Sequence, residues 1–143
     1  MSRIYINSSK TDNTRKYSTL VFIIQGSNIQ VFFKVLKDLK KENFDNVCLI
    51  YFDKSVDNLP FLSEIEYWIK TTKWTIDVMV SNDAPKDWKY LEGDINSSIA
   101  YRKIPDSNSS TAVFASVYNA QKAEISDKLD TKGYKTKQVF WIN

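Results

Sequence analysis

Short apolar runs and longer amphipathic stretches alternate along the chain. Residues 20–24, LVFII, contain no polar position, which is typical of a strand buried on both faces of a parallel sheet. After a four-residue turn, apolar side chains recur at helical spacing from Ile29 to Leu39, and lysines occupy the opposite side. The pattern predicts a strand, a turn and a helix over residues 20–39.

The same alternation continues to the end of the chain. Further strands are predicted over residues 47–52, 75–80, 111–115 and 138–142, and further helices over residues 60–69, 94–102 and 120–129. Pro60 suits the first turn of its helix, Asp94 or Asn96 is expected to cap the next, and Gly133 to end the last. Alternating polar and apolar residues make 75–80 an expected edge strand, and 81–93 is expected to be a long loop. Together these elements predict an α/β fold, a three-layer sandwich around a five-stranded parallel sheet.

Composition limits what such a domain can do. A length of 143 residues with 43% hydrophobic residues suits one packed domain, and a net charge of +3 from interleaved charges argues against nucleic-acid binding. The apolar runs are far shorter than the roughly 20 residues of a membrane span. The chain has no histidine, which removes imidazole metal ligands and histidine acid–base schemes, so no metal site is expected. Cys48 is the single cysteine and lies in an apolar run, which indicates a buried thiol in an intracellular, reducing compartment, cytoplasmic or mitochondrial.

Residues 1–19 differ from the rest of the chain. They are polar and rich in hydroxyl groups, with four basic residues against one acidic residue, Asp12. We expect a flexible polar arm here. A mitochondrial presequence is the alternative, but the residues around Ile4 do not make a good amphipathic helix.

The turn after the first strand is the first candidate for chemistry. In a doubly wound fold this turn faces the ligand crevice, and a phosphate cradle there needs several glycines. Only Gly26 is present among Gln25, Gly26, Ser27 and Asn28. Asp53, at the end of the second strand, has the position of a ribose-binding carboxylate, although membership of an ordinary polar loop is the favoured interpretation.

Four stretches resemble the C-terminal, pyridine-nucleotide-binding domain of the ferredoxin–NADP reductase superfamily, and cytochrome b5 reductases most of all. Residues 25–31 occupy the place of the family's Gly-Gly-Thr/Ser-Gly-Ile-Thr-Pro loop, and residues 51–59 precede an acidic helix as they do there. Residues 84–88, with Gly93, match the family's Ala-Pro-x-x-Trp and following glycine. Residues 113–120, followed by 132–134 and 139–140, are similar to the family's Cys-Gly-Pro loop, last helix and terminal strand. The resemblance covers residues 20–143 and implies the strand order 3-2-1-4-5.

The departures from the family fall on the ligand loops. Gln25 and Asn28 replace two loop glycines, and the family's Cys-Gly-Pro-Pro is Ala-Ser-Val-Tyr at residues 115–118. The family's flavin-binding barrel is expected to be missing, because residues 1–19 are all that precede the resemblance. The cofactor-binding positions that the resemblance implies are therefore expected to be vestigial: Gly26, Ser27, Asn28, Asp53, Ser116 and Tyr118. No catalytic residue and no bound cofactor are expected, and any NAD(P) binding should be weak.

Three interpretations of function follow. The first is a non-catalytic interaction or structural protein, a subunit of a larger assembly. The second is the NAD(P)H-binding half of a split flavin-dependent oxidoreductase, whose flavin domain lies on another chain. The third is another small α/β binding module, such as a flavodoxin-like or receiver fold, and the receiver is disfavoured because the first strand lacks an acidic cluster at its end.

A partner chain is expected to cover aromatic side chains near the missing flavin domain. The family positions that face that domain correspond to Tyr118, Phe140 and Trp141. Tryptophan is enriched among interface hot spots, which makes Trp141 the expected anchor. The alternative is that Trp141 packs under the last helix as ordinary core.

Overall fold

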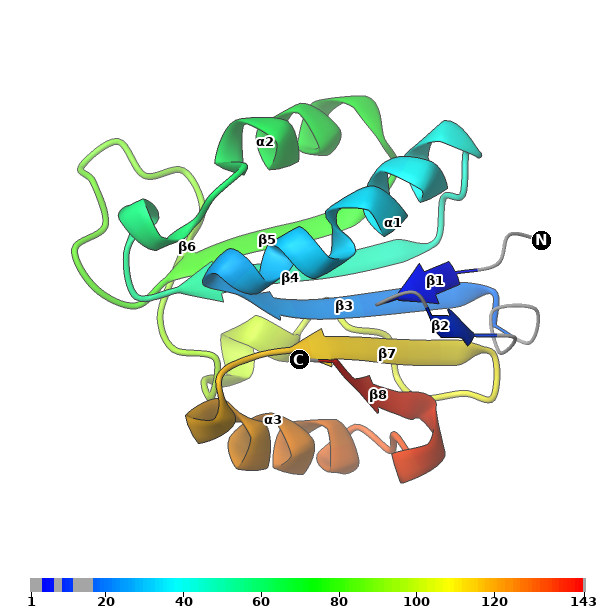
Figure 1. The fold of residues 1–143 in the computed structure, drawn as a ribbon. Helices are drawn as coiled ribbons and strands as arrows, with labels where there is room; N and C mark the ends of the chain where they lie inside the picture. The colour runs from blue at the N-terminus through cyan, green and yellow to red at the C-terminus, as the bar shows by residue number, and fades with distance from the viewer. Residues whose placement is uncertain (1–3, 7–8, 12–16, 143) are drawn as a thin grey trace.

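A computed structural model of the protein describes residues 4–6, 9–11 and 17–142. Its centre is a sheet of six parallel strands in the spatial order β6-β5-β4-β3-β7-β8 (Figure 1). In chain order these strands are β3 (Thr19–Gln25), β4 (Val47–Asp53), β5 (Thr75–Val80), β6 (Leu91–Glu92), β7 (Thr111–Ser116) and β8 (Val139–Trp141).

The five predicted strands are present, parallel and in the predicted order, but the predicted number is wrong. The additional strand, β6, lies within the segment expected to be a long loop, and it pairs Leu91 with Met79 of β5. A two-residue strand is too short to show a periodicity of its own. β6 pairs with the last two residues of β5, so the prediction that β5 is an edge strand is wrong for Met79 and Val80.

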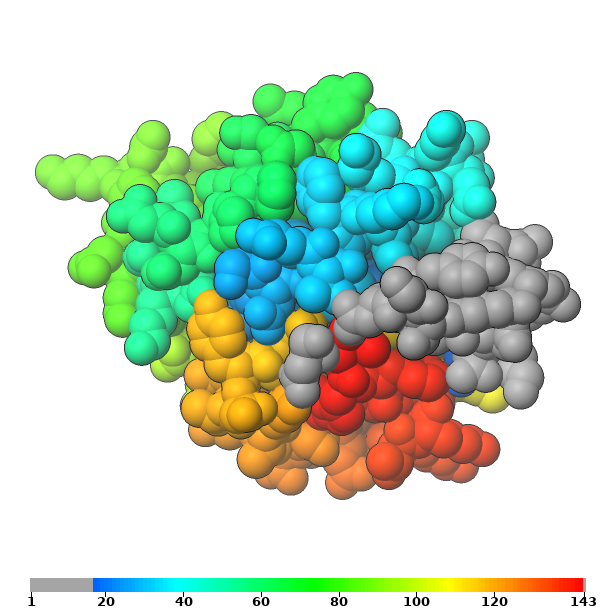
Figure 2. All heavy atoms as spheres, viewed as in Figure 1, coloured from blue at the N-terminus to red at the C-terminus, as the bar shows by residue number. Residues whose placement is uncertain are grey.

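Helices cover both faces of the sheet. α1 (Ile29–Lys41) and α2 (Leu62–Thr71) lie on one face, and α3 (Asn119–Thr131) lies on the other with the 3-10 helix Ser98–Tyr101 (Figure 1). In Figure 2 the side chains of α1 and α2, coloured blue to green, close over the sheet. This is the predicted three-layer arrangement. No helix in the described part of the chain is long and apolar enough to cross a membrane.

Two helix predictions need correction. The helix expected over residues 94–102 is only the 3-10 turn Ser98–Tyr101, and its N-cap is Ser97 instead of Asp94 or Asn96. The short segment must turn again to bury Ile104, which leaves no room for a longer helix. α2 begins at Leu62 and not at Pro60, because the Tyr51 hydroxyl donates to the Pro60 carbonyl oxygen at 2.5 Å and the chain turns at Phe61, whose φ is 61°.

The segment predicted to be a flexible arm contains two short strands. β1 (Ile4–Ile6) and β2 (Ser9–Thr11) pair antiparallel. Tyr17 is buried, so the packed domain begins slightly before residue 20. Residues 1–3, 7–8 and 12–16 lie outside the described residues, and the flexibility of the arm stays a prediction.

The core follows the alternation of side chains along the central strands. Leu20, Phe22 and Ile24 of β3 face α1, whereas Val21 and Ile23 face α3. Each face of the sheet therefore has its own apolar layer. All eight residues predicted for the interior are at most 5% exposed: Val21, Phe22, Ile24, Cys48, Leu49, Ile50, Val113 and Phe114.

Replacing Phe22 by alanine should destabilise the fold strongly. Its ring is fully buried and lies 5.4 Å from the ring of Phe32 and 5.5 Å from that of Phe114. We expect a loss of roughly 3–5 kcal/mol in the free energy of unfolding, measured in urea. Tyr67→Ala, at an exposed aromatic position of α2, is the control and should change it little. Equal stability of Phe22→Ala and wild type would contradict the assignment.

Burial of Cys48 should make stability fall in alkali. Burial, and to a lesser degree the negative charge of Asp77, raises the pKa of the thiol from 9.0 to about 12. Because the folded pKa exceeds the unfolded one, this stabilisation is complete below pH 9.0 and is lost as the pH rises toward about 12. Unfolding in urea at several pH values measures the effect, and Cys48→Ala should show a smaller decline. Rapid reaction of the native thiol with a disulfide reagent near pH 8 would contradict it.

Candidate functional site

The candidate site lies at the carboxyl end of the sheet, where the neighbours of β3 are β4 on one side and β7 on the other. Strand order reverses at this point, which is where open α/β sheets bind ligands. All six predicted cofactor positions come to this end. Gly26, Ser27 and Asn28 form the 3-10 turn between β3 and α1, Asp53 ends β4, Ser116 ends β7, and Tyr118 precedes α3.

Gly26 is the most tightly packed point of the site. Its φ is 53°, which favours glycine. A Cβ at this position would lie 2.2 Å from Oδ2 of Asp53 and 2.7 Å from the hydroxyl oxygen of Tyr118. The two polar side chains therefore pack directly against the glycine, in the space that a ligand approaching the turn would need.

A hydrogen bond joins these two side chains. The Tyr118 hydroxyl donates to Oδ2 of Asp53 at 3.1 Å, and the backbone N–H of Lys54 donates to Oδ1 at 2.8 Å. Asp53 is 6% exposed, whereas Tyr118 is 44% exposed. Partial burial and then the charge of Asp53 raise the pKa of Tyr118, and the Ser27 side chain lowers it by less. The hydroxyl is therefore protonated at neutral pH and can act as the donor.

Gln25 connects the same two loops a second time. Its side chain is buried, and its Oε1 accepts the backbone N–H of Tyr118 at 2.9 Å. Gln25 thus bridges the turn after β3 to the segment after β7. Sequence reasoning missed this role, although a polar residue at the end of an apolar strand is the signal that could have found it.

Ser116 and Asn28 take little part in this network. The Ser116 hydroxyl is buried and has no hydrogen-bond partner among the described residues. Asn28 precedes α1 without capping it through its side chain, and the first turn of α1 has no acidic residue. The amino end of α1 could attract an anion. Asp53 and Tyr118 lie against Gly26, beside this end of the helix.

The three partner-binding candidates do not share one surface. Phe140 and Trp141 are neighbours in β8 and point to opposite faces of the sheet. Phe140 stacks on Phe114 at 5.2 Å between ring centroids and packs with the α1-side core. Tyr118 is exposed at the crevice.

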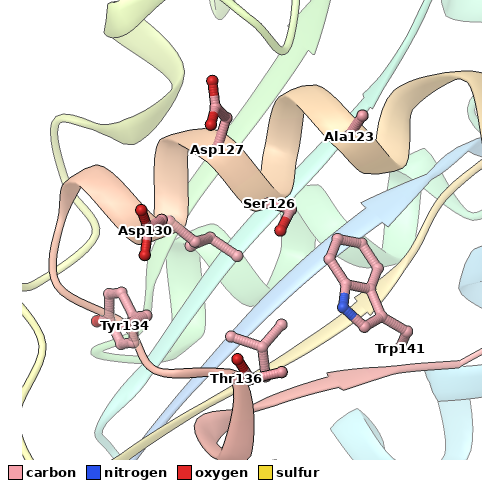
Figure 3. Close-up of a pocket in the computed structure, with 9 residues that line it drawn as sticks. Ala123, Ser126, Asp127, Asp130, Tyr134, Thr136 and Trp141 are labelled. Carbon is pink, nitrogen blue, oxygen red and sulfur yellow. The ribbon is translucent and has the colours of Figure 1, made fainter.

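Trp141 lies in a groove between α3 and β8. Figure 3 shows its indole rising from β8 toward α3, with Ser126 on the helix above and Tyr134 and Thr136 at the far end. The groove has a volume of about 400 Å³. Trp141 is half-buried, so it is neither a free surface residue nor part of a closed core.

No protein-family model and no curated protein matches the chain. Solved structures do resemble it. The cytochrome b5 reductase domain of Ulva prolifera nitrate reductase has a TM-score of 0.79 at 15% identity, over 94% of this chain and 51% of that one. The CS-b5R domains of human Ncb5or, in the NAD+ form, have a TM-score of 0.76 at 14% identity, over 93% of this chain and 39% of that one.

A third solved structure has a similar fold. Ferredoxin NADP+ reductase from Neisseria gonorrhoeae, with bound FAD and NADP, has a TM-score of 0.72 at 17% identity, over 95% of this chain and 62% of that one. The chain thus spans about half of the first structure it resembles and less than two thirds of the others. The fold is that of the reductase domains, consistent with their C-terminal NAD(P)-binding domain, which confirms the resemblance found in the sequence.

The packing around Gly26 can be tested by a double-mutant cycle. Gly26→Ala should cost roughly 2–5 kcal/mol of unfolding free energy, from the left-handed backbone and from the clash with Asp53. In an Asp53→Ala background only the contact with the Tyr118 hydroxyl, at 2.7 Å, remains, and the cost should fall by roughly 1–2 kcal/mol. Urea denaturation of the four proteins measures both values. An equal cost in the two backgrounds would show that the carboxylate moves aside freely.

Proposed function

We propose that this chain is a non-catalytic interaction or structural protein, a subunit of a larger assembly, built on the fold of a reductase nucleotide-binding domain with a degenerate site. The observation that supports this most is the packing of Asp53 and Tyr118 against Gly26. The protein's own side chains take the space in which a dinucleotide would approach the turn.

Electrostatics favours the same conclusion. A phosphate about 4 Å from the buried carboxylate of Asp53 would be repelled by about 4 kcal/mol at an effective dielectric constant near 20. The amino end of α1 offers an anion about 0.3–1 kcal/mol, or up to about 2 kcal/mol when partly buried. The repulsion is the larger effect, so the crevice in this conformation disfavours phosphate.

The two titratable side chains of the crevice, Asp53 and Tyr118, are hydrogen-bonded to each other. The chain has no histidine, and the raised pKa of Tyr118 keeps its hydroxyl protonated at neutral pH. Hydride transfer is chemistry that a cofactor supplies. We therefore assign no catalytic residue.

The second candidate is the NAD(P)H-binding half of a split flavin-dependent oxidoreductase of the cytochrome b5 reductase type. One observation favours it: Tyr118 is 44% exposed, so its ring could leave the crevice by rotation about the side-chain bonds. A flavin-domain protein would then be the partner. Binding of NAD(P)H would require both the departure of Tyr118 and neutralisation of the charge on Asp53.

Titration of the purified chain with NADH and NADPH separates the two candidates. We expect Kd values weaker than about 1 mM for wild type, measured by calorimetry, and no reduction of a dye by NADH after addition of FAD. Asp53→Asn with Tyr118→Phe removes the charge and the hydroxyl and should strengthen binding. Asp57→Asn, an exposed carboxylate beyond β4, is the control and should not. Micromolar binding or dye reduction by wild type would overturn the proposal.

A further inference from the structure

The outer edge of β8 lies beside the groove that contains Trp141. The backbone N–H of Ile142 donates to the carbonyl oxygen of Ala115 at 2.8 Å, across the pair formed by β7 and β8. Neighbouring residues of a strand direct their backbone groups to opposite sides, so Trp141 directs its N–H and C=O away from β7. Among the described strands, none pairs with this edge of β8.

The charged residues that line the groove are both acidic. Asp127 and Asp130 project from α3, and both are exposed (Figure 3). Neither carboxylate makes a hydrogen bond or an ion pair with any described residue, and the indole N–H of Trp141 makes no hydrogen bond with any described residue either. The groove therefore combines an aromatic face, two free carboxylates and an unpaired strand edge.

We propose that this groove binds an extended segment of a partner protein that carries lysine or arginine. The segment adds a strand to β8 and places one cationic side chain against the Trp141 ring and another toward Asp127 and Asp130, which lie farther along α3 (Figure 3). Strand addition supplies backbone hydrogen bonds, and the groove supplies side-chain specificity. The inference rests on the interaction role in the proposed function and names the class of partner, but it does not depend on the state of the crevice.

The charge and the size of the groove favour an extended segment with cationic side chains. A cation is attracted by the face of an indole ring and by both carboxylates, whereas a nucleic acid or an acidic peptide would bring like charge toward them. A second copy of the chain, paired through the same edge, would bring two sets of aspartates together. A volume of about 400 Å³ is at the small end of the range for ligand pockets, roughly 300–1,000 Å³, which suits one or two long side chains and not a folded element.

The test uses a fluorescein-labelled peptide of alternating valine and lysine, seven residues long, and the full-length protein in an anisotropy titration. We expect saturable binding by wild type. Asp127→Asn with Asp130→Asn should weaken it roughly three- to tenfold, and Trp141→Leu should weaken it about tenfold. Glu124→Gln, an exposed acid of α3 that does not line the groove, is the matched control and should leave the Kd unchanged. If Trp141→Leu also lowers the melting temperature, the double asparagine variant decides.

Two altered peptides examine the mode of binding. Glutamate in place of lysine should abolish binding, which supports the charge argument. Methylation of every internal backbone nitrogen should abolish it too, because a peptide without N–H groups on either edge cannot donate to β8. Equal binding of the methylated peptide, no binding of the lysine peptide, or an unchanged Kd in the double asparagine variant would overturn the proposal.

Sedimentation and titration with NADH distinguish a failure of the groove proposal from a failure of the proposed function. A concentration-dependent dimer that the double asparagine variant alters would assign the groove to a second copy and overturn the proposal. NADH binding to wild type would overturn the proposed function alone. If wild type bound neither the lysine peptide nor NADH, the groove proposal alone would be overturned.

Discussion

The burial of β3 on both faces and along both edges is the constraint on which the rest of the structure depends. Every residue from Leu20 to Gln25 is buried, and the strand pairs in parallel with β4 and with β7. Because β4, β3 and β7 are parallel, their carboxyl ends lie together at the same end of the sheet. Burial also forces Gln25, the polar residue that ends β3, to satisfy its amide inside the protein, and the Tyr118 backbone N–H is the partner it finds.

That partnership makes the crevice an organised part of the fold and not an open loop region. Gln25 fixes the backbone at Tyr118, which places the hydroxyl over Gly26 and within hydrogen-bonding distance of Asp53. The carboxylate is buried and receives two hydrogen bonds, so it has a stable position. Gln25, Asp53 and Tyr118 thus hold these loops together.

The two edge strands of the sheet are both short. At one edge β6 is a two-residue strand, and at the other β8 is a three-residue strand beside an acidic groove. Short edge strands limit uncontrolled pairing with other chains. In the interaction that we propose, the groove next to β8 adds side-chain requirements to pairing with this strand.

Sequence alone determined the strands other than β6 in the six-stranded sheet, and their order, because apolar runs of β-branched and aromatic residues must be buried and the family resemblance supplied the topology. It also placed Gly26, Asp53 and Tyr118 at one end of the sheet, since the carboxyl ends of parallel strands meet there. Sequence reasoning failed for β6, which has only two residues. It also failed for the start of α2, which depends on the hydrogen bond from the Tyr51 hydroxyl to the Pro60 carbonyl oxygen.

Only the tertiary structure decided what these residues do. Tyr118 lies 93 residues from Gln25 and 65 residues from Asp53, and contacts over such separations depend on side-chain rotamers that no local pattern specifies. Alternation along β8 requires Phe140 and Trp141 to face opposite ways. Which of them enters the core beside Phe114, and which enters the groove under α3, follows from the register of β8 against β7, and that register is set by the packing of the whole sheet.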